Sequence, residues 1–170
     1  MVIFLLGFMG SGKTTYGKKL AKSLTYNFID LDMAIEKEEN ASIAFIFETK
    51  GEEYFRTIEH QKLKSLLTLK NTVIACGGGT PCFFNNIDLM NKYGLTVYLE
   101  LKVDIIYSRL KQNKEQRPLI KQLKEDDLHS FIRNELDKRK ADYLKSALVV
   151  DGLNLKIKNL TEKIKNFMIA

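Results

Sequence analysis

A glycine-rich motif near the start of the sequence has the residue types of a phosphate-binding loop. Residues 7–14 read Gly-Phe-Met-Gly-Ser-Gly-Lys-Thr, a match to G-x-x-x-x-G-K-[ST] placed between an apolar run and an amphipathic one. Glycines let backbone N–H groups converge on phosphate oxygens, and a following helix adds positive potential. Lys13 would reach the outer phosphates, and the Thr14 hydroxyl would hold Mg²⁺. The residues expected to contact ATP here are Gly10, Ser11, Gly12, Lys13, Thr14 and Thr15.

Two acidic residues, Asp30 and Asp32, lie at the end of the second apolar run. Parallel sheets bind ligands beyond the carboxyl ends of their strands, and strand alternation would place both carboxylates on the same side. Near Mg²⁺ and ATP, one carboxylate would orient the metal or its water, and the other would accept a proton from an alcohol. The alternative interpretation is that Asp32 caps a helix at residues 33–38.

Two later features are also suited to phosphoryl transfer. Gly77, Gly78 and Gly79 follow the third apolar run, where a bare backbone allows either a sharp turn or the close approach of a ligand. Arg117 precedes a proline inside a basic stretch, and an arginine in such a loop would neutralise the charge that develops on a transferring phosphoryl group.

The elements that must position these residues alternate between short apolar runs and longer amphipathic ones, which is typical of a parallel α/β sheet. Five strands are expected because five runs are rich in branched or aromatic residues, at 2–7, 27–30, 72–75, 95–101 and 147–151. Helices are expected at 13–24, 52–69, 83–93, 103–111 and 126–144, with a closing helix around 157–167.

Composition and charge indicate one soluble domain spanning residues 1–170. Hydrophobic residues make up 45% and charged residues 28% of the chain, and the first apolar run is far shorter than the ~20 residues that a bilayer requires. Two cysteines are too few for a disulfide framework, so a reducing cytoplasm is expected. The net charge of +6 suits a polyanionic ligand. Part of it lies at 111–124, which suggests a bound phosphate, although a solvated charged face is an even alternative.

The order of the motifs resembles one family, the shikimate kinases. After the phosphate loop come Asp-x-Asp at 30–32, Gly-Glu-Glu-Tyr-Phe-Arg at 51–56, the triple glycine, Arg-Pro-Leu at 117–119 and a late Arg139. Each motif alone is moderately specific, but all of them occur in family order and cover essentially the whole chain. The sequence is therefore similar to the shikimate kinases as a whole and not at one site alone.

The resemblance implies a fold and an activity. The fold is a P-loop NTPase of the nucleoside-monophosphate-kinase type, with three α/β/α layers, a five-stranded parallel sheet, a substrate-binding segment at about 31–60 and a mobile lid at about 111–124. The activity is the transfer of a phosphate from ATP to the 3-hydroxyl of shikimate, which gives shikimate 3-phosphate in aromatic amino acid biosynthesis by way of chorismate.

The resemblance also implies roles for the matching residues. Asp30 and Thr14 match metal-binding positions, and Asp32 matches the residue that contacts the substrate hydroxyls and is the usual general-base candidate. Arg117 matches the lid arginine, which would act on ATP and would be catalytic together with Lys13 and Asp32. The positions that match shikimate-binding residues are Asp32, Arg56, Gly77, Gly78, Gly79 and Arg139.

The predicted substrate-binding roles of Arg56 and Arg139 depend on the resemblance. Without it, Arg56 would be interpreted as the surface partner of Glu53 or Glu59, and Arg139 as one of several exposed cations. Chemistry agrees with the family assignment, because a carboxylate substrate is bound best by planar, bidentate guanidinium groups.

The sequence departs from the family's pattern around adenine. The family often has an arginine seven residues before the lid arginine, but Leu110 occupies that position and Arg109 precedes it, so Arg109 is the residue expected to contact ATP. The family also tends to have a proline after the last strand, where this chain has Asp-Gly-Leu-Asn at 151–154.

Other classes of protein are alternatives. A gluconate kinase shares the fold and the first motif but not the set of arginines and glycines. A nucleotide-dependent switch protein usually has Asn-Lys-x-Asp, whereas residues 91–94 and 113–116 lack the aspartate. A basic nucleic-acid binder would have aromatic residues interleaved on a basic face. The expected partners are ATP and shikimate, without nucleic acid or membrane, and the chain is expected to be a monomer.

Overall fold

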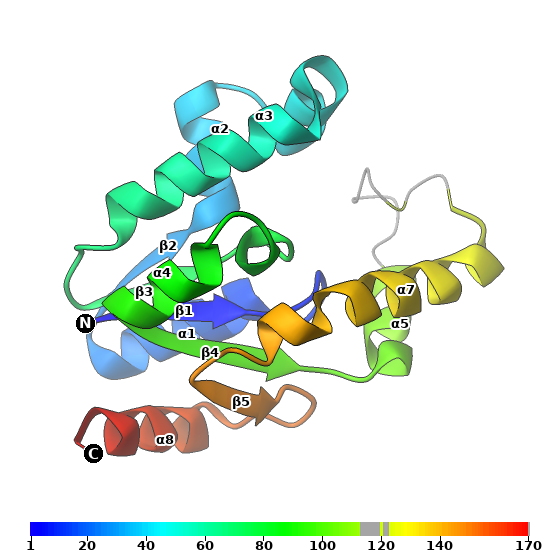
Figure 1. The fold of residues 1–170 in the computed structure, drawn as a ribbon. Coiled ribbons are helices and arrows are strands. Elements are labelled where there is room, and N and C mark those ends of the chain that lie inside the picture. The colour runs from blue at the N-terminus through cyan, green and yellow to red at the C-terminus, as the bar shows by residue number, and fades with distance from the viewer. Residues whose placement is uncertain (113–119, 121–122, 170) are drawn as a thin grey trace.

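Five parallel strands form one sheet in the computed structural model, which describes residues 1–112, 120 and 123–169 (Figure 1). The strands are β1 (Val2–Leu6), β2 (Asn27–Asp30), β3 (Thr72–Ala75), β4 (Gly94–Glu100) and β5 (Leu148–Asp151). Their order is β2-β3-β1-β4-β5, and every neighbouring pair is parallel. The predicted strands are confirmed, each end lying within one residue of its expected position.

β1 lies in the middle of the sheet, and both of its faces are buried. Its sequence Val-Ile-Phe-Leu-Leu contains no polar residue, which suits a strand covered by helices on both sides. Val2, Phe4 and Leu6 join one apolar cluster, whereas Ile3 and Leu5 join another. Because side chains alternate along a strand, β1 packs against both helical layers and fixes the start of the loop that follows it.

Helices cover both faces of the sheet, so the predicted three-layer α/β/α arrangement is confirmed (Figure 1). The helices in the described part of the chain are α1 (Lys13–Leu24), α2 (Leu31–Glu39), α3 (Ile43–Leu66), α4 (Asn86–Tyr93), α5 (Val103–Gln112), α7 (Glu125–Tyr143) and α8 (Ile157–Ile169), with a 3-10 turn η1 at Thr80–Cys82. α1 and α8 pack on one face, and α2, α3 and α4 pack on the other. Over the described residues, no helix has the length and apolar character that a membrane crossing would require.

A third apolar cluster joins the phosphate loop to α5 and α7. Phe8, which follows the first glycine of the motif, is buried with Leu110 of α5 and Ile132 of α7. Figure 1 shows α7 running beside α5 toward the carboxyl end of the sheet. The loop is therefore anchored by apolar packing on the side where the two later helices approach it.

The helices that differ most from the sequence prediction are α3 and α4. α3 begins at Ile43, nine residues before the predicted start, because Ser42 caps it by accepting a hydrogen bond from Phe45 N at 3.2 Å. Gly51 then breaks the helical geometry with φ 82° and ψ 171°, so two helical segments meet at a kink. α4 begins later than predicted, at Asn86, since Phe84 adopts a left-handed φ of 51°.

Candidate active site

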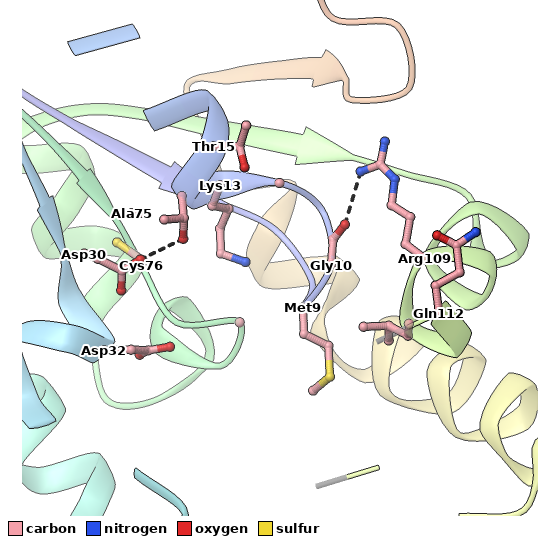
Figure 2. Close-up of a pocket in the computed structure, with 14 residues that line it drawn as sticks. Met9, Gly10, Lys13, Thr15, Asp30, Asp32, Ala75, Cys76, Arg109 and Gln112 are labelled. Carbon is pink, nitrogen blue, oxygen red and sulfur yellow. Dashed lines mark hydrogen bonds between the residues drawn. The ribbon is translucent and has the colours of Figure 1, made fainter. Parts of the chain in front are cut away.

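A cavity of about 430 Å³ opens at the carboxyl end of the sheet, between the phosphate loop, the end of β2 and α5 (Figure 2). It brings together the phosphate loop, both predicted aspartates, the middle glycine of the triplet and Arg109. Its lining residues are Met9, Gly10, Gly12, Lys13, Thr14, Thr15, Asp30, Asp32, Ala75, Cys76, Gly78, Arg109, Leu110 and Gln112. Ser11 lies in the same loop but is fully buried beneath it.

The backbone of the phosphate loop is shaped by its glycines. Gly10 and Gly12 adopt φ angles of 79° and 93°, a left-handed backbone conformation that residues with a Cβ rarely adopt. α1 begins directly after Gly12, and no side chain among the described residues caps it. The first N–H groups of α1 therefore face the cavity without a side-chain acceptor, which suits an anion.

Lys13 lies across the loop that precedes it. Its ammonium donates hydrogen bonds to the carbonyl oxygens of Gly7 at 2.8 Å and Phe8 at 3.0 Å. Figure 2 shows the side chain directed into the cavity, between the loop and the aspartates. The ammonium is thereby held at the point where the loop, the helix start and the carboxylates meet.

Asp30 and Asp32 both line the cavity, but not for the reason that the sequence suggested. β2 ends at Asp30, so Asp32 lies in the first turn of α2 and strand alternation does not place it. The capping residue is Asp30, whose carboxylate accepts a hydrogen bond from Met33 N at 3.4 Å, so the alternative interpretation that Asp32 caps the helix is wrong. The other oxygen of Asp30 accepts a hydrogen bond from the Thr14 hydroxyl at 2.7 Å (Figure 2).

Burial changes the proton affinity of Asp32. Removal from water, followed by repulsion from Glu59, raises its pKa from 3.8 to about 6, although the nearby ammonium of Lys13 acts in the opposite direction. A carboxylate with this pKa is largely ionised at pH 7 and still accepts a proton readily. That is the property expected of a general base.

The triple glycine lets three of the predicted site side chains approach the backbone closely. None of the three has a positive φ, so backbone conformation does not require glycine here. A Cβ on Gly77 would lie 2.9 Å from an Asp32 carboxylate oxygen, and a Cβ on Gly79 would lie 2.7 Å from an Arg56 guanidinium nitrogen. A Cβ on Gly78 would lie 3.4 Å from Arg139. The predicted turn is present, since residues 78–79 form a turn and Thr80 N donates a hydrogen bond to Gly77 O at 3.2 Å, whereas the close approach of a ligand stays a prediction.

Arg56 is fixed by acidic and aromatic neighbours. Its guanidinium forms ion pairs with Glu52 at 3.0 Å and with Glu59 at 2.9 Å, and it lies 4.1 Å from the centre of the Phe83 ring. The Arg56 side chain is 11% exposed and Glu59 is 0% exposed, so this ion pair is buried, whereas Glu52 is exposed. Charge pairs out of water are held rigidly when every partner is satisfied.

Arg139 approaches from the last turns of α7. Its guanidinium forms an ion pair with Glu135 at 2.6 Å and lies 5.3 Å from the centre of the Phe8 ring. The side chain is 18% exposed, so Arg139 differs from the exposed lysines beside it in sequence. Arg56 of α3 and Arg139 of α7 therefore lie close to neighbouring glycines of the triplet, Gly79 and Gly78.

Arg109 lies at the rim of the cavity beside the phosphate loop. One of its guanidinium nitrogens donates a hydrogen bond to Gly10 O at 3.1 Å (Figure 2). Leu110 is 1% exposed and packs in the third apolar cluster, so its side chain does not reach outward as Arg109 does. Arg117 and the predicted lid residues 113–119 and 121–122 lie outside the described residues.

Sequence reasoning missed Tyr143 and named Glu59 only as a surface partner of Arg56, yet both residues border the site. Glu59 is buried between Arg56 and the Thr80 hydroxyl, which donates to it a hydrogen bond of 2.6 Å. Tyr143 is buried and donates a hydrogen bond to Gly78 O. Each lies three or four residues after a predicted arginine, and that helical spacing was the available signal.

The chain passes from a strand through a glycine-rich loop and a lysine into a helix, and this loop lines a cavity together with two carboxylates. That arrangement defines a P-loop kinase. Comparison with known proteins narrows this class. A family model described as shikimate kinase matches residues 9–169. The chain belongs to the shikimate kinase family.

Relatives with this name match over almost the full length of the chain. A shikimate kinase of Parabacteroides distasonis is 39% identical over 167 residues, which cover 98% of this chain and 96% of the relative. A shikimate kinase of Azobacteroides pseudotrichonymphae is 42% identical over the same length and the same shares of both chains. The sequence match thus extends through the phosphate loop and the last helices alike.

Solved structures agree with the sequence match. A shikimate kinase from Bacteroides thetaiotaomicron superposes with a TM-score of 0.91 at 35% identity and covers 100% of this chain and 99% of its own. A shikimate kinase from Acinetobacter baumannii in complex with shikimate has a TM-score of 0.87 at 33% identity, with coverage of 99% and 92%. A gluconokinase from Sinorhizobium meliloti has a TM-score of 0.61 at 16% identity, which shows a shared fold alone.

Proposed function

We propose that the protein transfers the γ-phosphate of ATP to the 3-hydroxyl of shikimate and so makes shikimate 3-phosphate for aromatic amino acid biosynthesis. The observation that carries the proposal is the convergence of Asp32, Arg56 and Arg139 on the triple glycine, beside the phosphate loop of a shikimate kinase family member. A base and two guanidinium groups suit an acceptor that carries both a hydroxyl and a carboxylate.

The phosphate loop is proposed to bind ATP. The N–H groups at the start of α1 and the ammonium of Lys13 face the cavity, so negative charge on the outer phosphates would be neutralised there. Arg109 is proposed to lie against the nucleotide at the other side of the loop, because it is already oriented by Gly10. Arg117 remains the predicted lid arginine.

Thr14 and Asp30 are proposed to hold Mg²⁺. Their oxygens lie 2.7 Å apart at the edge of the cavity. Mg²⁺ prefers oxygen ligands and takes only one or two from protein, with water and phosphates as the rest, so this pair fits the ion. The fit agrees with the absence, among the described residues, of any cluster of three or more metal-binding side chains. When bound, Mg²⁺ supplies positive charge to the phosphates.

Asp32 is proposed to act as the general base. Its carboxylate lies near Lys13 and lines the same cavity as the phosphate loop. It would orient the acceptor hydroxyl for in-line attack and accept its proton as the oxygen–phosphorus bond forms. The pKa of about 6 leaves most of the carboxylate ready to accept that proton at pH 7.

Arg56 and Arg139 are proposed to bind the shikimate carboxylate. A guanidinium has five N–H groups, and within the described structure Arg56 uses three of them on Glu52 and Glu59. The groups that remain suit a carboxylate held in a fixed orientation. The ion pairs thus orient the Arg56 guanidinium and leave two of its N–H groups for the substrate.

The remaining expectations are proposals as well. The chain is proposed to act as a monomer of one domain. We propose that this monomer works in the cytoplasm with ATP and shikimate and has no nucleic-acid or membrane partner. Measurement of its molar mass in solution and a filter-binding assay with single- and double-stranded nucleic acid test these statements.

An ADP-release assay tests the proposed reaction. The acceptors are shikimate, gluconate and AMP, with a reaction that contains ATP but no acceptor as the control. We expect ADP release with shikimate well above the control and none above it with the others. Turnover with gluconate or AMP but not with shikimate would contradict the proposal.

A further inference from the structure

The buried side chain of Tyr143 connects the end of α7 to the triple glycine. Its hydroxyl donates a hydrogen bond of 2.6 Å to Gly78 O, and the residue is 0% exposed. Its ring stacks on Tyr98 of β4, with ring centres 4.8 Å apart and planes inclined by 22°. The strand therefore fixes the ring while the hydroxyl fixes the glycine carbonyl.

Gly78 lies where three parts of the site meet. A Cβ on this residue would be 3.4 Å from Met9 N in the phosphate loop and 3.4 Å from a guanidinium nitrogen of Arg139. Its neighbours Gly77 and Gly79 contact Asp32 and Arg56 in the same way. A small displacement of the Gly78 peptide would therefore change the space available to the base and to both arginines.

A run of three glycines does not hold its own shape. Glycine has the largest backbone freedom of any residue, so such a run stays ordered only where its polar groups have fixed partners. Gly77 O accepts a hydrogen bond from Thr80 N at 3.2 Å and Gly79 O accepts one from Cys82 N at 2.9 Å, both from the adjacent turn η1. The hydrogen bond from Tyr143 differs because it comes from a residue 65 positions away.

The Tyr143 hydroxyl remains a donor at any pH at which the enzyme would work. Burial raises the pKa of Tyr143 above its usual value, and the nearby Arg139 guanidinium only partly offsets the effect. Tyr143 and Arg139 are four residues apart on α7, so they face the same way. One turn of α7 thus presents the guanidinium and the hydroxyl together to the triple glycine.

We propose that Tyr143 is a positioning residue: its hydroxyl holds Gly78 O and thereby sets the triple glycine against which Asp32, Arg56 and Arg139 are placed. Tyr143 does not itself touch shikimate. The inference rests on the proposed function, since the quantity that it predicts is the affinity for shikimate. ATP binds to the phosphate loop and α1, and its affinity should be independent of the Tyr143 hydroxyl.

The test removes the hydroxyl and keeps the ring. Tyr143→Phe loses the hydrogen bond to Gly78, whereas Tyr98→Phe loses a hydroxyl from the other ring of the same stack and serves as the matched control. Among the described residues, no hydrogen bond joins Tyr98 to the triple glycine, and Tyr98 lines a separate cavity that Glu100 and Lys140 also border. Calorimetry measures the Kd of shikimate and of ATP for each protein, and thermal unfolding checks the fold.

We expect Tyr143→Phe to raise the Kd of shikimate by about 3- to 10-fold, the effect of losing one neutral hydrogen bond. The Kd of ATP should stay within about 2-fold, and Tyr98→Phe should leave both values within that range. A purely structural role would instead lower the unfolding temperature and weaken both ligands equally. If Tyr143→Phe does not fold, Tyr143→Met offers the same measurement with a flexible apolar side chain.

Three results would overturn the inference. They are an unchanged shikimate Kd in Tyr143→Phe, an equal loss of affinity for ATP, and an equal effect of Tyr98→Phe. Failure of the proposed function is distinguishable, because the unaltered protein would then not bind shikimate at all. If the unaltered protein binds shikimate and Tyr143→Phe binds it equally well, the inference about Tyr143 fails alone.

Discussion

A methyl group added at Gly79 should weaken shikimate binding through Arg56. The Cβ of Gly79→Ala would lie 2.7 and 2.8 Å from the two terminal nitrogens of Arg56 and 2.9 Å from the carbon between them. The backbone of Gly79 has φ −92° and ψ −14°, which alanine adopts without strain. The guanidinium itself must therefore move.

Arg56 cannot move without breaking its contacts. Glu52 and Glu59 hold it at about 3 Å, and the Phe83 ring lies 4.1 Å from its central carbon. Misplacing this guanidinium should cost on the order of 1.5–3 kcal/mol, the value of a charged hydrogen bond, or about 10- to 150-fold in the Kd of shikimate. The Kd of ATP should change by less than about 2-fold, since no contact of the phosphate loop is lost.

A double-mutant cycle decides whether Arg56 carries the effect. Calorimetry with shikimate is carried out on Gly79→Ala, Arg56→Ala and the double variant, with thermal unfolding as a check of the fold. Once Arg56 is removed, Gly79→Ala has nothing to displace, so the double variant should bind shikimate about as weakly as Arg56→Ala alone. Additive losses in the double variant would refute the reasoning.

Further predictions concern Lys13, Asp32 and Arg139. Lys13→Ala should abolish turnover while thermal unfolding shows a folded protein, because the ammonium is built into the phosphate loop; near-normal activity would contradict this role. Asp32→Asn should lower kcat by roughly 10²- to 10⁴-fold, and kcat/KM of the unaltered enzyme should fall as pH drops through about 6, where the carboxylate becomes protonated. The pKa of Asp32 is raised on folding, so its contribution to stability is lost as pH rises through about 6, and thermal unfolding should show Asp32→Asn more stable than the unaltered protein at pH 7 but not at pH 4. Arg139→Lys keeps the charge but loses the planar fork, so calorimetry should show weaker shikimate binding and unchanged ATP binding, whereas equal shikimate affinity would remove Arg139 from the proposed site.

The strands and the phosphate loop could be predicted because their signals are local. A continuous apolar run such as Val-Ile-Phe-Leu-Leu indicates a strand buried on both faces, and G-x-x-x-x-G-K-T marks a turn whose backbone is set by its own glycines. The first part of α3 was missed because Gly51 interrupts the periodicity and the Ser42 cap is a weak signal. Arg56 and Arg139 have no such local signal, and they were predicted as site residues because the motifs occur in family order.

The side-chain environment of the site could not be predicted from local signals. The burial of Glu59 depends on Thr80, 21 residues later, and the partner of Tyr143 lies 65 residues earlier. The misplacement of Asp32 on a strand came from a boundary, since the chain changes from β2 to α2 between Asp30 and Leu31. A shift of one residue at that boundary decides whether the direction of a carboxylate side chain follows the two-residue alternation of a strand or the 3.6-residue turn of a helix.

The hydrogen bond from Tyr143 to Gly78 has a consequence for the chain while it is being synthesised. The ribosome releases the phosphate loop and both aspartates early, whereas Arg139 and Tyr143 emerge only with the last third of the sequence. On the proposed assignment, a nascent chain would contain the ATP-binding residues well before it contains Tyr143, which donates a hydrogen bond to Gly78 O. On the proposed site assignment, phosphoryl transfer to shikimate would begin only after α7 has been synthesised and has packed against the triple glycine.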